Sequence, residues 1–212
     1  MGELPSLRFR PPVRLPGIHV ELVPLSPTHR ADLTEAGRAP EIWTYFRDRP
    51  QYFPGGMEGL IAELLRRQEA GTDLPFTILA GPERRPVGMT RFLGIDRANR
   101  SVEIGGTWIP PDLWGSPVNP ESKYLLLQYA FEEEKVARVQ IKTDVRNGHS
   151  QRAIEKLGAV REGVLRHHIR LPDGHLRDSV LYSILDSEWP AVRSRLEARL
   201  SLPWGSRAAP PS

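Results

Sequence analysis

Residues 143–184 read TDVRNGHSQRAIEKLGAVREGVLRHHIRLPDGHLRDSVLYSI, and this stretch decides the fold. Its helical part ends at Gly158, a residue type that commonly stops helices. Further on, Pro172-Asp173-Gly174 is a strong hairpin turn between two long apolar-rich segments. The expected elements are a strand over 138–145, a helix over 150–159 and two strands over 160–171 and 175–185.

Upstream of this stretch, apolar residues recur in some segments at the spacing of strands and in others at the spacing of helices. Ser26 and Pro27 mark a helix start, because a capping hydroxyl followed by proline suits the first helical turn. A second helical region with an aromatic face follows. The remaining expected elements are strands over 19–25, 76–81, 86–96 and 100–109, and helices over 57–68, 119–134 and 188–200.

The resulting order, β–α–α–β–β–β–α–β–α–β–β, predicts one α+β domain without repeats. A helix between the fourth and fifth strands implies a parallel crossover at that point. A phosphate-bearing ligand would bind where such a strand leads into a helix N-terminus. We expect an irregular arm over 1–16, the folded domain over 17–190, and a C-terminal helix with a disordered tail over 187–212.

The composition excludes several classes of function. The 212 residues include no cysteine, which rules out disulfides, thiolate metal sites and a cysteine nucleophile. The six histidines have no carboxylates at ligand spacing, so no metal is expected. The net charge of +3 comes from dispersed arginines, which argues against a nucleic-acid partner. Neither a membrane span nor a signal peptide is visible, and a cytoplasmic protein is expected.

The segment 108–133, WIPPDLWGSPVNPESKYLLLQYAFEE, carries a candidate anion site. A strand ends in a turn-rich loop, and Asn119, with Glu121 or Ser122, is placed to cap the helix that follows. Free backbone N–H groups and the helix dipole would then favour a pyrophosphate. A capped helix after a turn is also a common structural feature that needs no ligand.

Four pieces of the sequence, taken together, resemble one family. They are the run from Asn147 through Ser150 to Ala159 with Glu162-Gly163-Val164-Leu165-Arg166, the hairpin Asp173-Gly174 with Arg177-Asp178 and Tyr182-Ser183, the upstream Glu103-Ile104-Gly105, and the stretch Trp114–Phe131. In this order they resemble acetyltransferases of the GNAT superfamily, in the RimJ/RimL-like branch that acetylates N-termini of ribosomal proteins. The resemblance covers about residues 17–190.

The resemblance implies the GNAT fold, a mixed, mostly antiparallel, splayed seven-stranded sheet flanked by helices. It also implies acetyl-CoA as cosubstrate, held between the fourth and fifth strands, and no metal. Backbone groups of Thr107, Trp108 and Ile109 would pair with the pantetheine. The pyrophosphate would lie at Gly115, Ser116, Val118, Asn119, Ser122 and Lys123, and the pantetheine or nucleotide end at Asn147, Ser150 and Arg152.

The chain departs from the family pattern at two places. The family's phosphate loop places glutamine or arginine, glycine, and glycine or alanine where this chain has Trp114, Pro117 and Asn119. Proline removes one N–H donor, for which side chains of Asn119, Ser122 or Lys123 would compensate. The tyrosine that protonates the leaving thiolate in many GNAT enzymes is replaced here by Ile154, and a glutamate base known in some relatives by Ile169.

Three residues are candidates for the chemistry. Glu103 is the first candidate for the base that deprotonates the amine, and a solvated strand carboxylate is the alternative. His168 is the second, with a structural histidine as alternative. Ser150 corresponds to the family's serine near the thioester sulfur, or it caps a helix. Asp178 either orients substrate or forms a structural pair with Arg177.

The expected function is acetyl-CoA-dependent N-acetyltransfer, moving an acetyl group directly to a primary amine of a protein N-terminus or small molecule. The alternative is a non-catalytic acyl-CoA-binding sensor. The expected partners are acyl-CoA and the amine acceptor, and the family alone suggests a homodimer. The aromatic residues that either wall the acceptor site or fill the core are Trp43, Tyr45, Phe46, Tyr52 and Phe53.

Overall fold

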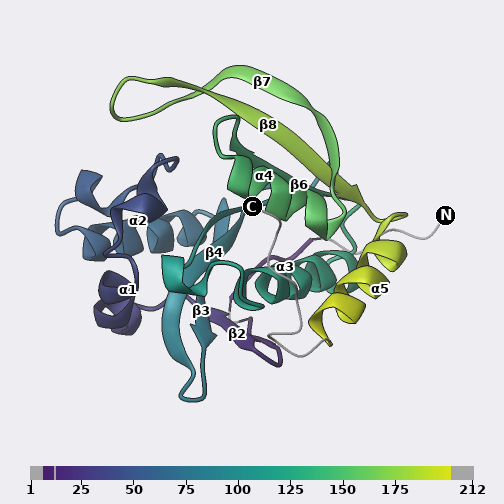
Figure 1. Cartoon of the computed structure of the whole chain (residues 1–212), viewed down its shortest axis with the longest axis horizontal. Coiled ribbons are helices and arrows are strands. Elements are labelled where there is room, and N and C mark those ends of the chain that lie inside the picture. Colours follow the sequence, from purple (N-terminus) through teal and green to yellow (C-terminus); the bar gives the residue numbers. More distant parts are fainter. Residues whose placement is uncertain (1–6, 12, 202–212) are drawn as a thin grey trace, which may run out of the picture.

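A computed structural model describes residues 7–11 and 13–201, whose strands form one eight-stranded sheet with helices packed around it (Figure 1). The strand order is β1-β2-β3-β4-β5-β6-β8-β7. The strands are β1 (Leu15–Pro16), β2 (Val20–Pro24), β3 (Asp73–Ala80), β4 (Arg85–Asp96), β5 (Ser101–Trp108), β6 (Arg138–Asp144), β7 (Val160–Arg170) and β8 (Leu176–Leu185). The predicted α+β class and mostly antiparallel sheet are confirmed, and β1 is the one strand that the sequence did not predict.

The helices also follow the predicted order. They are α1 (Arg30–Ala36), α2 (Met57–Glu69), α3 (Val118–Gln128), α4 (Gly148–Leu157) and α5 (Trp189–Leu200), and a π-helical turn, Tyr129–Glu133, continues α3. The second predicted helical region contains only a short 3-10 turn, Pro40–Trp43, and another, Pro50–Tyr52, lies in the turn-rich sequence after it. Both turns begin with proline, and the proline- and glycine-rich sequence after them prevents a longer helix.

The helix α4 shows how local sequence sets an element's bounds. The side chain of Asn147 caps its first turn by accepting a hydrogen bond from the Ser150 N–H, at 3.0 Å. Gly158 ends the helix in the left-handed conformation, with φ of 102°. The predicted stop at Gly158 is therefore confirmed, and the start lies two residues earlier than predicted.

The apolar core is divided by the sheet into two clusters. On one face, side chains such as Phe76, Phe92 and Ile104 pack against α3 and α5. On the other face, Met89 and Trp108 join Trp43 and residues of α1 and α2. No helix in the described part of the chain is long and apolar enough to cross a membrane.

The N-terminal arm, predicted to be irregular over 1–16, is partly built into the domain. Leu7 and Phe9 are buried, and the Phe9 ring meets the Phe92 ring edge-on, with centroids 4.9 Å apart. The buried carboxylate of Glu134 accepts the N–H groups of Arg8 and Phe9. Leu15–Pro16 pairs with β2, so apolar side chains and backbone pairing fix this segment. The predicted tail over 203–212 lies outside the described residues.

The only parallel pairing among the described strands joins β5 to β6. It runs from Ser101–Glu103 to Arg138–Gln140 and then stops. The strands continue beyond this point, β5 to Trp108 and β6 to Asp144, without pairing to each other. The helix crossover predicted between the fourth and fifth sequence strands is thus confirmed, and the sheet is splayed where these two strands separate.

Candidate active site

A cleft of about 930 Å³ lies where β5 and β6 separate. Its walls come from β5, β6, the starts of α3 and α4, the 41–48 segment and the β7–β8 hairpin, which arches over α4 in Figure 1. The predicted site residues in its lining are Glu103, Thr107, Trp108, Ile109, Gly115, Asn119, Lys123, Asn147, Ser150, Arg152 and His168. Ser116, Val118 and Ser122 do not line it.

The start of α3 differs from the predicted cap. The helix begins at Val118, whose N–H donates to Ser116 Oγ at 3.2 Å, and Asn119 lies inside the first turn. The prediction that Asn119 caps the helix is therefore wrong, because Pro117 already adopts helical angles one residue earlier. Ser122 is fully buried, and its hydroxyl donates to the Val118 carbonyl at 2.7 Å. Its side chain therefore serves the helix rather than the cleft.

Glu121, proposed as a capping partner, has another role. Its buried carboxylate accepts the N–H groups of Ile18, His19 and Val20 at 2.7 to 2.8 Å. These donors precede and begin β2, so Glu121 attaches the sheet's N-terminal edge to α3. Because Glu121 is also in the first turn of α3, the positive end of the helix dipole stabilises its charge.

Lys123 occupies the interior of the cleft. Its side chain is only 5% exposed, and its Nζ donates to Thr107 Oγ1, which in turn bonds Thr90 Oγ1. Burial lowers the pKa of Lys123 from 10.5 to about 7, although the nearby Glu103 charge opposes this effect. The amine therefore lies beside β5, and a substantial fraction is neutral near pH 7.

Glu103 lies at the last paired position of β5 and β6. Its carboxylate forms an ion pair with Lys142 of β6, with Oε2 2.8 Å from Nζ. The carboxylate side chain is 11% exposed and that of Lys142 17%, so neither is a solvated surface charge. The alternative of a solvated strand carboxylate is therefore wrong for Glu103, which is fixed at the point of divergence.

The α4 N-terminus forms another wall. Asn147 Oδ1 is used by the helix cap, and the Ser150 backbone N–H is its donor. Arg152 is exposed, one turn into the helix. Trp114, from the loop after β5, lies against the His149 ring with centroids 5.6 Å apart. This contact joins the loop before α3 to the start of α4, and the sequence patterns did not predict it.

His168 and Arg177 come from the β7–β8 hairpin. Ser179 Oγ accepts from Arg177 Nε at 3.1 Å and shares a 3.1 Å hydrogen bond with His168 Nδ1. Burial lowers the pKa of His168, as do the charges of Lys142, Arg177 and Arg47. Asp178 is used structurally: it accepts the N–H of His167, a residue with φ of 49° at an irregular point of β7.

The aromatic residues divide between the two predicted roles. Trp43, Tyr45 and Phe46 line the cleft, while Tyr52 and Phe53 do not. Trp43 also packs against Trp108 of β5, with ring centroids 5.1 Å apart. Trp43 therefore belongs both to the wall of the cleft and to the apolar core.

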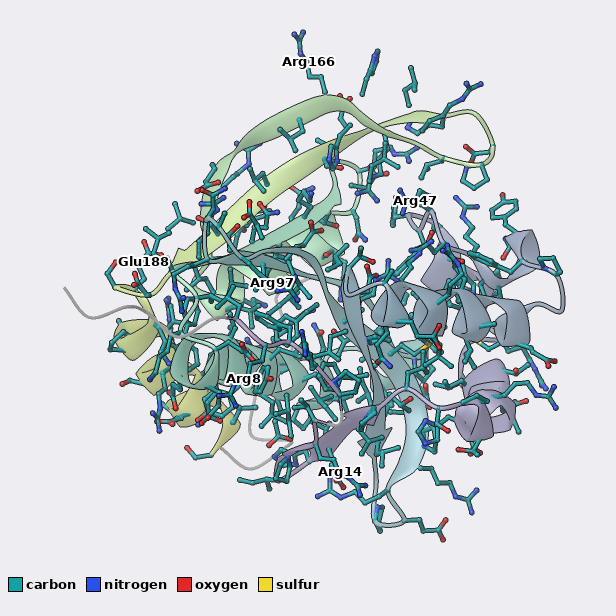
Figure 2. The ribbon with its side chains drawn as sticks, turned by 180° about the vertical axis from the view of Figure 1, so that it is seen from behind. Arg8, Arg14, Arg47, Arg97, Arg166 and Glu188 are labelled. Atoms are coloured by element: carbon teal, nitrogen blue, oxygen red, sulfur yellow. The ribbon has the colours of Figure 1, made fainter. Side chains whose placement is uncertain are left out.

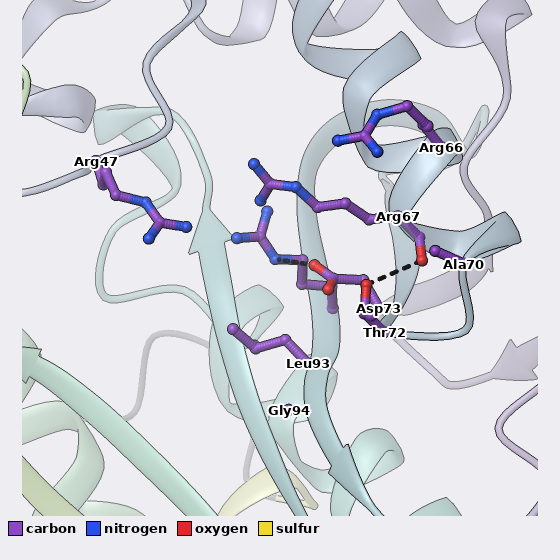
Figure 3. A pocket seen from close by; sticks show the side chains of 9 residues that line it. Arg47, Arg66, Arg67, Ala70, Thr72, Asp73, Leu93 and Gly94 are labelled. Atoms are coloured by element: carbon purple, nitrogen blue, oxygen red, sulfur yellow. Dashed lines mark hydrogen bonds and ion pairs between the residues drawn. The ribbon is translucent and has the colours of Figure 1, made fainter.

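An arginine cluster, Arg47, Arg66, Arg67 and Arg91, lines a smaller cavity of about 410 Å³ beside the cleft (Figure 3). Asp48 binds Arg67 and Arg91 at 2.8 and 2.9 Å, and Asp73 pairs with Arg91 at 3.1 Å. Burial alone would raise the pKa of Asp48, but the hydrogen bond from Arg67 and the surrounding arginine charges lower it to about 2. The arginines come from α2, β4 and the 47–48 segment and their partner Asp73 from β3, so no local motif predicts the cluster.

With this geometry in view, the comparisons assign the chain to a class. The sequence model of the acetyltransferase (GNAT) domain family matches residues 19–160, two thirds of the chain. The protein is therefore an N-acetyltransferase of the GNAT family. The RimJ/RimL-like resemblance is confirmed, since several of the similar proteins belong to that branch.

Particular relatives are similar over most of their length. YdaF, a candidate ribosomal N-acetyltransferase of Bacillus subtilis (strain 168), is 29% identical over 147 residues, which is 69% of this chain and 78% of YdaF. A candidate acetyltransferase from T. thermophilus is 40% identical, with a TM-score of 0.79, covering 94% of this chain and all of the other. Mycobacterium smegmatis RimJ, solved in complex with CoA-disulfide, is 21% identical, with a TM-score of 0.73 over 85% of this chain and 88% of RimJ.

Proposed function

We propose that the protein transfers the acetyl group of acetyl-CoA directly to a primary amine, and that the cleft between β5 and β6 is where this occurs. The single observation that carries the proposal is the early end of the β5–β6 pairing at Glu103. Beyond it, β5 has backbone groups facing the cleft that no β6 partner occupies, and these suit the amides of a pantetheine arm. That M. smegmatis RimJ binds a CoA derivative supports the assignment.

The phosphates of CoA suit one end of this cleft. The N-termini of α3 and α4 both line it, and helix N-termini favour anions through their free N–H groups and dipoles. Gly115 has φ of 80°, so the loop between β5 and α3 needs a residue without a Cβ at that position. Asn119, Asn147 and Arg152 supply polar side chains around the same end.

The acetyl transfer needs a neutral amine and a route for its proton. The amine nitrogen attacks the thioester carbonyl carbon, the carbon–sulfur bond breaks, and CoA leaves as its thiol or thiolate. Glu103, at the point of strand divergence, is the proposed acceptor of the ammonium proton, directly or through water, with Lys142 holding its carboxylate in place. Ser150, at the start of α4, is the proposed neighbour of the sulfur.

His168 fits a positioning role better than that of a base. The Ser179 hydroxyl oxygen accepts from Arg177, and in the tautomer in which its own proton is donated to His168 Nδ1 the ring proton lies on Nε2. In that tautomer the imidazole offers a donor, rather than an acceptor, from its second nitrogen.

Incubation of the purified protein with acetyl-CoA and a panel of amines tests the proposal. The panel comprises peptides with free N-termini, amino acids and polyamines, and free CoA thiol and acetylated product are measured together. We expect thiol release that depends on the amine, and a fall in kcat of about 100-fold or more in Glu103→Gln, because general base catalysis contributes about that much. Glu133→Gln, which changes an exposed carboxylate outside the cleft, is the matched control.

The second candidate, a non-catalytic acyl-CoA sensor, has one supporting observation. Ile154 is buried and lines the cleft where many family members have a tyrosine, so no phenol is available there to protonate the thiolate. Saturable acetyl-CoA binding without acetylated product from any amine in the panel would favour the sensor and exclude the enzyme.

A further inference from the structure

Arg177 is a partly buried arginine of the cleft that has no acidic partner. Its Nε donates to Ser179 Oγ and its Nη1 donates to the Tyr45 carbonyl, both at 3.1 Å. Among the residues that the structure describes, no carboxylate lies within ion-pair distance of its guanidinium. Two neutral oxygens therefore fix the orientation of the side chain, and no acceptor in residues 7–11 and 13–201 binds its Nη2.

The carboxylates nearby are already committed to other cations. Glu103 pairs with Lys142, and Asp144 holds Arg146 through two contacts of 3.0 and 2.7 Å. Asp48 is shared by Arg67 and Arg91, and its other oxygen accepts from Arg47 Nε at 3.3 Å. The remaining acidic residue of the lining, Glu41, is exposed. The cleft around Arg177 therefore has more positive than negative charge.

Other basic groups reinforce this excess. Both Arg47 and Arg177 depress the pKa of His168. Burial is the main cause that lowers the pKa of Arg177; the charges of Asp144 and Glu103 raise it, and those of Arg47 and Arg146 lower it. In Figure 2, Arg47 lies beneath the β7–β8 hairpin, on the side of the molecule that carries the helical region. Among the residues that line the cleft, basic side chains outnumber acidic ones, and this excess would stabilise an anion there.

The hydrogen bonds of Arg177 go to β8 and to the 41–48 segment and not to α3 or α4, although Arg146, just before α4, lies over the Tyr45 ring at 5.8 Å. Arg177 contacts Tyr45, in the segment that packs with α1 and α2, whereas the helix N-termini proposed for the phosphates belong to α3 and α4. The positions proposed for the CoA phosphates therefore leave Arg177 without an assigned anion.

We propose that the amine acceptor carries an oxyanion, a carboxylate or a phosphate, on the same molecule as its amine, and that Arg177 binds this group with His168 and Arg47 beside it. The inference rests on the proposed acetyltransferase function. A guanidinium is suited to the task because its planar N–H groups can make paired, charge-assisted hydrogen bonds to two oxygens. The acceptor class is therefore amino acids, acidic amino-terminal peptides or phosphorylated amines, rather than uncharged or polycationic amines.

The test compares matched pairs of acceptors that differ only in the anion. The pairs are an L-amino acid and its carboxamide, a peptide with glutamate or glutamine at its second position, and phosphoethanolamine and ethanolamine. For each pair, the ratio of kcat/KM is measured for the native protein, Arg177→Gln and Arg177→Lys. Arg166→Gln is the matched control: it removes an exposed arginine of the same hairpin, and Figure 2 shows Arg166 pointing away from the molecule.

We expect one or more pairs to favour the anionic member, and Arg177→Gln to reduce that preference about tenfold or more, the effect of losing one charge-assisted pair. Arg177→Lys should keep part of the preference, because it keeps the charge without the planar fork, and Arg166→Gln should keep all of it. The pair that responds identifies a carboxylate or a phosphate. Because each result is a ratio within one protein, a general loss of activity in Arg177→Gln does not affect it.

Calorimetry of the same pairs in the presence of CoA distinguishes the two ways of failing. If no amine is acetylated but the anionic members bind more tightly and lose this advantage in Arg177→Gln, the enzyme proposal fails and the anion site stands. If neither turnover nor binding distinguishes the members of any pair, or if Arg177→Gln leaves every ratio unchanged, the anion site is wrong.

Discussion

At the scale of single residues, Lys123 is the side chain whose chemistry is most altered by its surroundings. Its pKa is lowered from 10.5 to about 7 by burial. The unfolded chain therefore binds more protons than the folded protein between these two values, and stability rises with pH across this window. Each unit of the shift corresponds to about 1.4 kcal/mol.

Substituting Lys123→Met should remove this pH dependence, because methionine is unbranched, of similar length and uncharged. We expect the Tm of Lys123→Met minus the Tm of the native protein to be largest near pH 7 and to shrink steadily towards pH 10, as the native protein gains stability. Buried tyrosines that titrate at high pH are common to both proteins and cancel. Thermal unfolding followed by circular dichroism at four pH values measures it, and a difference that is constant with pH would contradict the buried, near-neutral lysine.

A second residue-scale prediction separates capping from ligand binding at Asn147. Asn147→Ala should lower the free energy of unfolding by about 1 kcal/mol, since the cap of α4 is lost. Asn147→Asp should keep the cap, because aspartate is an equally good N-cap, while its charge weakens CoA binding about tenfold through repulsion of the phosphates. Denaturant titration and calorimetry with CoA give the two quantities. Equal CoA affinity in all three proteins would remove Asn147 from the site.

At the scale of elements, Glu121 connects two parts of the chain that local sequence cannot relate. Its carboxylate accepts three backbone N–H groups at the start of β2, about a hundred residues away. Glu121→Gln should destabilise the protein by about 2 kcal/mol, because the neutral amide has only one accepting oxygen and leaves buried donors without a partner. Urea titration measures the loss, with Glu133→Gln as the exposed control. A change of less than about 0.5 kcal/mol in Glu121→Gln would show that the connection is not stabilising.

The sequence predicted most of the helices and strands, but only part of the candidate site. The alternation in β6, the glycine stop at Gly158 and the hairpin turn at 172–174 act over a few residues, so each predicts its own element. The side-chain directions at α3 depend on packing, so the sequence did not predict that Lys123 donates to Thr107. The surroundings of Arg177 and of the arginine cluster are set by tertiary contacts, which no local sequence pattern predicts.

At the scale of the whole molecule, the parallel pairing between β5 and β6 is short, and a ligand between them would contact both halves of the sheet. Acetyl-CoA should therefore raise the Tm as its concentration rises, by an amount equivalent to about 2.7 kcal/mol at 100 times Kd. Differential scanning fluorimetry measures this, with adenosine as a control that lacks the pantetheine and pyrophosphate. The absence of any shift with acetyl-CoA, CoA or longer acyl-CoAs would exclude the proposed use of the cleft.

The attachment of the N-terminal segment also has a consequence for the protein's synthesis. Residues 8–20 are made before the carboxylates that bind them, since Glu121 and Glu134 follow more than a hundred positions later. On the ribosome, this segment leaves the exit tunnel long before its acceptors exist. Residues 8, 9 and 18–20 can therefore form these hydrogen bonds only after α3 and the turn that continues it have been translated.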